Sequence, residues 1–225
     1  MASDQDTYGY GWHNEITGSF FEDISKTGTE ATFDTNNDGS APIELPFPFS
    51  FYGQHYTIVY ASINGILTVG GQSSNDSYKN REIPSTTPPN LGIIAPFWDD
   101  LDPKSTGKLY YKNFEDGQKK FIIQWDKWGW YRSTMNGQTA TFQVWLLPEF
   151  ERNNKKCDIY FIYKEFTGMA PGNSYTVGIE SVVGNLGLQI HYNTDNGVRN
   201  DYNIHISAPY PPYIRRNLPT YLQRL

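Results

Sequence analysis

The chain has 225 residues, a formal net charge of −6 and an aromatic content of 16%. Its acidic balance argues against a nucleic-acid binder, which would carry clustered basic residues. No stretch approaches the ~20 apolar residues of a membrane-spanning helix, so we expect no membrane insertion. The single cysteine, Cys157, excludes an internal disulfide. The start, MASDQDTYGYGW, lacks the basic and apolar regions of a signal peptide, and we interpret the chain as one domain of a longer protein.

The first third of the chain predicts extended structure. Residues 1–33 are polar with scattered aromatic residues, and we expect an N-terminal extension that packs on the domain. Three prolines between positions 42 and 48 exclude a helix and predict an edge strand. Its alternate residues would share one face: Ile43, Leu45, Phe47, Phe49 and Phe51. Residues 56–69 look like two strands joined by a type I′ turn at Asn64-Gly65.

The segment from residue 90 to 111 changes abruptly from apolar to acidic. Its apolar part must pack in the core, and Pro96 predicts an edge or a bulged strand. The preceding loop contains the tripeptide Asn75-Asp76-Ser77, a glycosylation sequon if the host glycosylates.

The remaining chain predicts further strands at short, regular spacing. We expect a hairpin around Asp116-Gly117, an aromatic loop over 126–138, and a last hairpin around Asn196-Gly197. The predicted strands are 109–112, 119–125, 139–147, 157–163, 175–180, 187–192 and 202–206. Such spacing without a helical period predicts an all-β fold, an antiparallel β-sandwich with long loops and little helix, over residues 34–207. Residues 208–225 are rich in proline and read as a linker or a surface strap.

Four segments together resemble the extracellular NIDO domain of nidogen and alpha-tectorin. They are FSFYGQHYTIVYASINGILTVG (49–70), IIAPFWDDLDP followed by GKLYY (93–111), FIIQWDKWGWY (121–131) and TATFQVWLL (139–147). The resemblance covers about residues 34–192, and YTVGIESVVGNLGLQIHYN (175–193) looks more like the bacterial relatives in secreted proteases and surface proteins. It implies a secreted or surface-exposed β-sandwich found in adhesion and matrix proteins. It implies no catalytic set and no defined ligand.

Two acidic segments are candidate calcium sites, because calcium takes several carboxylate and carbonyl oxygens. The first is Asp99, Asp100 and Asp102, of which Asp100 and Asp102 match the family pattern and Asp99 does not. The second is Asp34, Asn36 and Asp38, which match the first half of an EF-hand loop. Leu45 stands where that loop needs its closing glutamate. The alternative for both segments is a turn in which aspartates cap backbone amides.

Three aromatic residues, Trp128, Trp130 and Tyr131, form a candidate ligand-binding site. Exposed aromatic side chains stack on sugar rings or anchor partner proteins. The alternative is that two of them close one end of the sandwich. The four histidines lie in separate segments without metal spacing, although His191 and His205 could face each other across the last hairpin. No nucleophile motif is present, so we expect no enzyme, although a pair of carboxylates could still make a glycosidase.

The sequence therefore predicts a non-catalytic adhesion or recognition module of a larger secreted or surface protein, with a protein or glycan ligand. The alternatives are a carbohydrate-binding module of a secreted hydrolase and a purely structural spacer or assembly domain.

Overall fold

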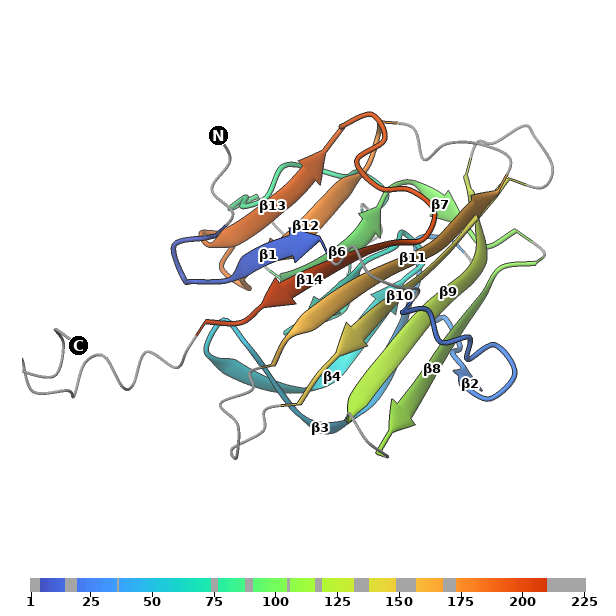
Figure 1. The fold of residues 1–225 in the computed structure, drawn as a ribbon, viewed down its shortest axis with the longest axis horizontal. Helices are drawn as coiled ribbons and strands as arrows, with labels where there is room; N and C mark the ends of the chain where they lie inside the picture. The colour runs from blue at the N-terminus through green and yellow to red at the C-terminus, as the bar shows by residue number, and fades with distance from the viewer. Residues whose placement is uncertain are drawn as a thin grey trace, which may run out of the picture.

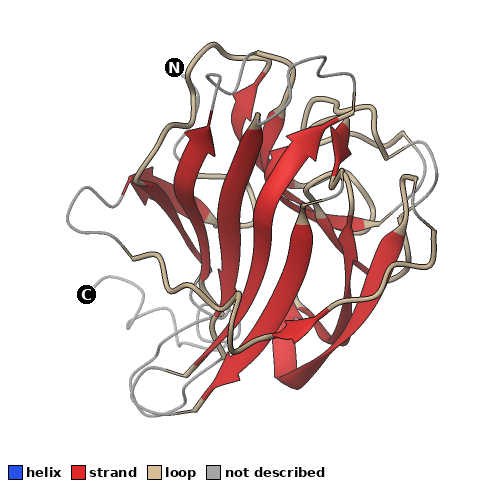
Figure 2. Ribbon diagram, turned by 90° about the vertical axis from the view of Figure 1, so that its right-hand side faces the viewer, coloured by secondary structure: helices blue, strands red, loops and turns tan. Residues whose placement is uncertain are grey.

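A computed structural model describes residues 5–14, 20–35, 37–73, 77–87, 91–104, 106–115, 119–131, 138–148, 157–167 and 173–209. The described residues form strands and loops without a helix (Figure 2). The strands build two antiparallel sheets that face each other (Figure 1). Their facing side chains form one large core. The predicted all-β sandwich is confirmed. The described part of the chain contains no helix of a length and hydropathy that would cross a membrane.

The two sheets differ in size and strand order. Sheet A has, in spatial order, β1 (Gly11–Asn14), β14 (Tyr202–Ser207), β11 (Ile159–Thr167), β10 (Thr139–Leu146), β9 (Lys120–Trp130), β8 (Lys108–Phe114) and β2 (Thr29–Glu30), and β7 (Leu101–Asp102) also pairs with β9. Sheet B has β13 (Gly187–Tyr192), β12 (Thr176–Glu180), β6 (Gly92–Trp98), β5 (Leu67–Val69), β4 (Gln54–Ser62) and β3 (Ser40–Phe51).

Strand β3 lies at an edge of sheet B, as its prolines predict. The predicted alternation is also confirmed: Ile43, Leu45, Phe49 and Phe51 are buried, and Phe47 packs partly against the core. Since proline has no backbone N–H, the three prolines of β3 reduce the number of free donors along this edge. The strand can therefore lie at the surface without inviting another strand to pair with it.

Strand β6 lies in the middle of sheet B, so the edge alternative for the Pro96 segment is wrong. The bulge alternative is right, because the pairing of β6 with β12 shifts register between Ala95 and Trp98. Strand β5 pairs with β6 only from Gly92 to Ile94. The missing N–H of Pro96 thus falls where the ladder is already interrupted.

The turn at Asn64-Gly65 joins β4 to β5 as predicted, but it is not type I′. That turn needs positive φ at both residues, and only Gly65 of the pair has positive φ, at 70°. The Gly65 N–H donates to Ser62 O at 3.3 Å, and the Ser62 N–H donates to Ile66 O at 2.8 Å. This is the longer hairpin connection, in which a left-handed glycine follows the turn.

Two predictions for the second half of the chain are wrong. Residues 126–130 belong to the long strand β9 and not to a loop. The last two strands are not a hairpin, because β13 pairs with β12 in sheet B and β14 pairs with β11 and β1 in sheet A. The intervening Asn196-Gly197 turn carries the chain from one sheet to the other. His191 and His205 therefore lie in different sheets.

The predicted hairpin of β8 and β9 is present, and its turn residues Asp116 and Gly117 lie outside the described residues. The described parts of the N-terminal extension contribute two strands to sheet A, β1 and β2. Between them, residues 20–28 cross the outer face of sheet A, where Ile24 is buried with Ile122, Trp145 and Ile162. Apart from Ala208 and Pro209, the predicted tail lies outside the described residues.

Candidate functional site

Asn64 is the centre of a polar cluster at one end of the sandwich. Its side chain is fully buried, with 0% exposure. The Asn64 Nδ2 donates to Asp38 Oδ1 at 2.8 Å and to Ser77 Oγ at 3.1 Å, and Asn64 Oδ1 accepts from the Leu101 N–H at 3.1 Å. Asn64 O accepts from the Asp99 N–H at 3.3 Å. One amide side chain thus joins both predicted acidic segments to the turn between β4 and β5.

The first acidic segment is a turn closed by its own aspartates. Asp34 Oδ1 accepts from the Thr35 N–H at 2.9 Å and from the Ser40 N–H at 2.8 Å, while Asp34 Oδ2 accepts from the Gln72 side-chain amide. Asp38 takes a positive φ of 53°, which aspartate tolerates better than most residues. Asn36 lies outside the described residues. The described carboxylates therefore cap donors of the protein itself.

Asp99, in the second acidic segment, is 6% exposed and accepts several hydrogen bonds. The Trp130 Nε1–H donates to Asp99 Oδ2 at 3.2 Å, Ser174 Oγ lies 3.1 Å and 3.2 Å from the two oxygens, and the Asp100 N–H donates to Oδ1 at 2.9 Å. Burial raises the pKa of Asp99 to about 6, although these donors oppose the shift. The carboxylate thus fastens β6 to β9 and to residue 174.

The Asp102 carboxylate is partly exposed, and both of its oxygens contact Lys104. Its Oδ1 accepts from the Lys104 N–H at 2.7 Å, and its Oδ2 forms an ion pair with Lys104 Nζ at 2.9 Å. Asp100 contributes its backbone O, which accepts from the Tyr131 N–H at 3.1 Å. Among the described residues, no three or more His, Cys, Asp or Glu side chains are placed to hold a metal ion. Calcium binding at either acidic segment stays a prediction.

The three aromatic residues of the predicted binding loop have different environments. Trp128 is 0% exposed and donates from Nε1 to Ile63 O at 2.7 Å. Trp130 is 9% exposed and packs edge-on against Phe97, with ring centroids 6.0 Å apart. Both tryptophans are therefore buried and close one end of the sandwich, as the alternative interpretation of this group has it. Tyr131 is 45% exposed, and ligand binding at this position stays a prediction.

A groove of about 380 Å³ opens at the flank where the edges of the two sheets face each other. It is lined by Thr27, Thr29, Glu44, Leu45, Pro46, Tyr111, Lys112, Asn113 and Phe121. One wall comes from β3 and the other from β2 and β8. Strand β2 pairs with β8 only at Tyr110 and Tyr111. Of the strands that the structure describes, none pairs with the outer side of β8 from Lys112 to Phe114.

A family model described as "NIDO related" matches residues 12–209. The chain belongs to this NIDO-related family. The match extends beyond the four resembling segments to β1 at one end and past β14 at the other. It therefore includes the strands that the N-terminal extension and the last quarter of the chain add to sheet A.

The NIDO-related domain is similar to parts of much longer animal proteins. It is 35% identical to dendrite extension defective protein 1 of Caenorhabditis elegans over 96 residues, covering 40% of this chain and 8% of that protein. It is 24% identical to human alpha-tectorin over 196 residues, which cover 77% of this chain and 9% of that protein. It is 23% identical to mouse nidogen-2 over 180 residues, which cover 64% of this chain and 12% of that protein. The chain thus spans about a tenth of these relatives. No solved structure matches it.

These relationships place the NIDO-related domain outside the cell, as a secreted or surface-exposed domain. The three relatives are animal proteins, and the resemblance of residues 175–193 to bacterial members stays a prediction. Asn75 and Asp76 of the sequon lie outside the described residues. Ser77 is 6% exposed and its backbone O accepts from the Trp98 Nε1–H at 2.6 Å, so this serine has a structural role.

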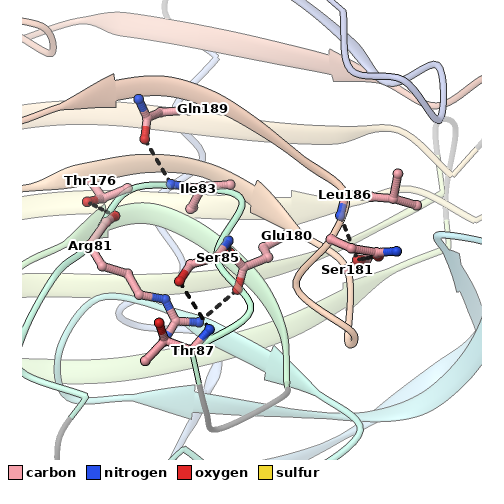
Figure 3. A network of polar contacts seen from close by, with 10 residues as sticks. Arg81, Ile83, Ser85, Thr87, Thr176, Glu180, Ser181, Leu186 and Gln189 are labelled. Carbon is pink, nitrogen blue, oxygen red and sulfur yellow. Dashed lines mark hydrogen bonds and ion pairs between the residues drawn. The ribbon is translucent and has the colours of Figure 1, made fainter.

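Sequence reasoning missed two polar centres of the NIDO-related domain. The sequence indicates only a turn at Asn64, although the Asn64 side chain makes the contacts described above. The second centre lies on the outer face of sheet B, where Glu180 is 1% exposed (Figure 3). Its Oε1 lies 2.8 Å from Arg81 Nη2, and its Oε2 accepts from the Ser85 N–H at 2.6 Å. No signal in the sequence links residues 81 and 180, because the contact depends on how a long loop folds over the sheet.

Proposed function

We propose that this domain is a non-catalytic adhesion or recognition module of a larger extracellular protein. The observation that carries the proposal is the use of its buried carboxylates. Asp99 and Glu180 accept hydrogen bonds from structural donors that hold loops and strands together. A catalytic acid or base must instead reach a proton of the substrate. The small share of each relative that the chain covers supports a module of a larger protein.

The groove between β3 and β8 is the recognition surface that the geometry supports best. Its lining combines apolar side chains, such as Leu45 and Phe121, with the charged side chains Glu44 and Lys112. No described strand pairs with the outer side of β8 beside it over residues 112–114. An extended protein segment can add to such an edge through main-chain hydrogen bonds while its side chains enter the adjoining groove. We therefore take an extended segment of a partner protein as the ligand.

Binding of the purified domain to a panel of purified matrix proteins and to a glycan array tests the proposal. We expect saturable binding to at least one protein of the panel. The variant Lys112→Glu should weaken it at least tenfold, because the charge reversal lies in the groove. Lys164→Glu is the matched control: Lys164 lies on β11, away from the lining of the groove, and its ammonium pairs with the exposed Asp201.

Three outcomes would overturn the proposal in different ways. Binding to the glycan array that is insensitive to Lys112→Glu would favour the carbohydrate-binding alternative. No binding to any protein or glycan, together with self-association of the domain, would favour a structural spacer. Equal effects of Lys112→Glu and Lys164→Glu on protein binding would remove the groove as the site.

A further inference from the structure

The pairing of β1 with β14 brings two histidines together on the outer face of sheet A. His13 lies directly opposite His205 in the register of the two strands. The neighbours of His205 in β14, Ile204 and Ile206, are buried between the sheets, so His205 points to the opposite side. His13 is exposed at the edge of the sheet. The two rings meet through His13 Nε2 and His205 Nδ1, which are 3.3 Å apart.

The ring of His205 is held from two further directions. Its Nε2 lies 2.9 Å from Asp158 Oδ2, and its plane stacks on Tyr160 with ring centroids 4.3 Å apart and an interplanar angle of 2°. Asp158 is itself fixed, because its Oδ1 accepts from the Ala208 N–H at 2.9 Å. When Nε2 donates its hydrogen to Asp158, Nδ1 carries the lone pair and faces His13. The carboxylate thus selects the tautomer that makes His205 Nδ1 a ligand atom.

This geometry is compatible with a metal-binding histidine pair. Metal-ligating histidines usually donate their other ring N–H to a carboxylate, as His205 does to Asp158. Two nitrogens that each lie ~2.0–2.1 Å from a tetrahedral ion are about 3.3–3.4 Å apart. The separation of His13 Nε2 and His205 Nδ1, 3.3 Å, falls at this value. A change of tautomer at the exposed His13 ring supplies the second lone pair without net proton release.

We propose that His13 and His205 bind one divalent transition-metal ion, such as Zn²⁺, and that Asp158 positions His205 for it. Imidazole nitrogens suit zinc and copper, whereas calcium prefers oxygen ligands. The described residues place no three His, Cys, Asp or Glu side chains around one point. Water therefore completes the coordination, and the site binds more weakly than a structural zinc site with four protein ligands.

A bound ion would fasten β1 to the rest of sheet A. Of the described strands, only β14 pairs with β1 (Gly11–Asn14), and an isolated bridge joins Gly11 to Gln5. Such a short edge strand opens easily in the native state. The ion would join it to β14 by a link between side chains, in addition to the backbone ladder. The site therefore couples metal availability outside the cell to the order of the N-terminal strand.

Calorimetric titration of the protein with ZnCl₂ tests the proposal, using protein without a histidine affinity tag. We expect one Zn²⁺ ion per chain. His13→Ala should lower the affinity at least tenfold, since one nitrogen ligand is lost, and Asp158→Asn should lower it about 10–100-fold. His55→Ala is the matched control, because His55 is exposed on β4 in the other sheet. Hydrogen exchange of residues 11–14 should slow with Zn²⁺ in the wild type and in His55→Ala only.

The proposal is overturned if Zn²⁺ does not bind stoichiometrically, or if His13→Ala binds it as tightly as the wild type. Because His13 is exposed, its replacement leaves the fold intact. The Zn²⁺ titration of His13→Ala therefore tests the proposal even if Asp158→Asn is unstable. Binding that His55→Ala weakens as much as His13→Ala would assign the ion to a different surface. A Zn²⁺ effect on exchange that is uniform over all strands would also contradict a clamp on β1.

Discussion

The outer faces of the two sheets are both covered, but the polar contacts that anchor the two covers differ. On sheet A, residues 20–28 cross the strands, and two buried amide side chains hold their backbone: Gln124 Oε1 accepts from the Ile24 N–H at 3.1 Å, and Gln143 Nε2 donates to Glu22 O at 2.7 Å. The Glu22 carboxylate, which is 39% exposed, also pairs with Lys120. On sheet B, residues 77–87 are held by the buried ion pair of Arg81 and Glu180 (Figure 3). We call these two segments the amide cover and the ionic cover.

Both covers shield apolar side chains that the sheets direct away from the core. Under the amide cover lie Ile122, Trp145 and Ile162, and under the ionic cover lie Ile66, Ile93 and Trp98. The burial of apolar surface drives the docking of both segments. The polar contacts differ in what their loss costs: a neutral amide left unpaired costs ~1–3 kcal/mol, whereas a buried charge left unpaired costs ~3–5 kcal/mol. The comparison therefore predicts that the ionic cover depends more strongly on a single polar partner.

The largest effect should come from Arg81→Ala. Glu180 is 1% exposed, so this variant leaves a carboxylate buried without its cation. We expect a loss of about 3 kcal/mol in the free energy of unfolding, at the low end of the range because the Arg81 side chain is 21% exposed. Urea denaturation at neutral pH measures the change.

A double variant separates the cost of an unpaired Glu180 charge from the cost of losing the Arg81 side chain. Arg81→Ala with Glu180→Gln removes the cation but leaves no unpaired charge, and it should be more stable than Arg81→Ala alone. Lys104→Ala is the control for an exposed pair, since Lys104 and Asp102 are 40% and 30% exposed, and should cost less than about 1 kcal/mol. A loss from Arg81→Ala no larger than that from Lys104→Ala would contradict the ionic account.

The second prediction concerns the amide cover, where packing should matter most. Ile24 is 1% exposed and contacts the apolar cluster on sheet A. Ile24→Ala should cost about 2 kcal/mol, from lost burial and the cavity left behind, at the low end of the range for a buried isoleucine because a surface segment can partly collapse into the space. Because Ile24→Ala removes an uncharged side chain and leaves the ion pair of Glu22 and Lys120 in place, added salt should leave this loss unchanged. Ile58→Ala is the matched control at a 38% exposed position and should change stability by less than about 1 kcal/mol.

The strands that the sequence predicted best are those with clear local patterns. The alternation in β3 and the Thr139–Leu146 strand follow from residue period alone, and both are present. The pairing of the last strands failed because Asn196-Gly197 has a local turn signature, although the partners β11 and β12 are set by the packing of the sandwich. Local turn chemistry fixes a change of direction but not the sheet that the next strand joins.

The environments of the candidate site residues also depend on tertiary contacts. The candidate aspartates and tryptophans do lie together at one end of the sandwich. Asn64 donates a hydrogen bond to Asp38 there, and the Trp130 Nε1–H donates one to Asp99. Whether such side chains face solvent or the interior depends on where β9 ends. Strand β9 continues to Trp130, and Trp128 on it is buried. No short pattern in the sequence predicts that the strand extends this far. Composition indicates which groups are available, but the tertiary contacts decide their use.

The smallest predicted effect is a difference in pH dependence. On the amide cover, the Ser25 N–H bond lowers the pKa of Asp23, so its contribution is present above the usual pKa and is lost as the pH falls. Asp99 follows β6 of sheet B, and burial raises its pKa to about 6. Its contribution to the free energy of unfolding is therefore present at low pH and is lost as the pH rises through that value.

Between pH 5 and 7.5 the free energy of unfolding of the wild type should therefore fall by about 1 kcal/mol through Asp99. Urea denaturation across this range should show that Asp99→Asn removes this loss, whereas Asp102→Asn keeps it. Parallel pH profiles of Asp99→Asn and the wild type would show that the buried carboxylate does not set the difference.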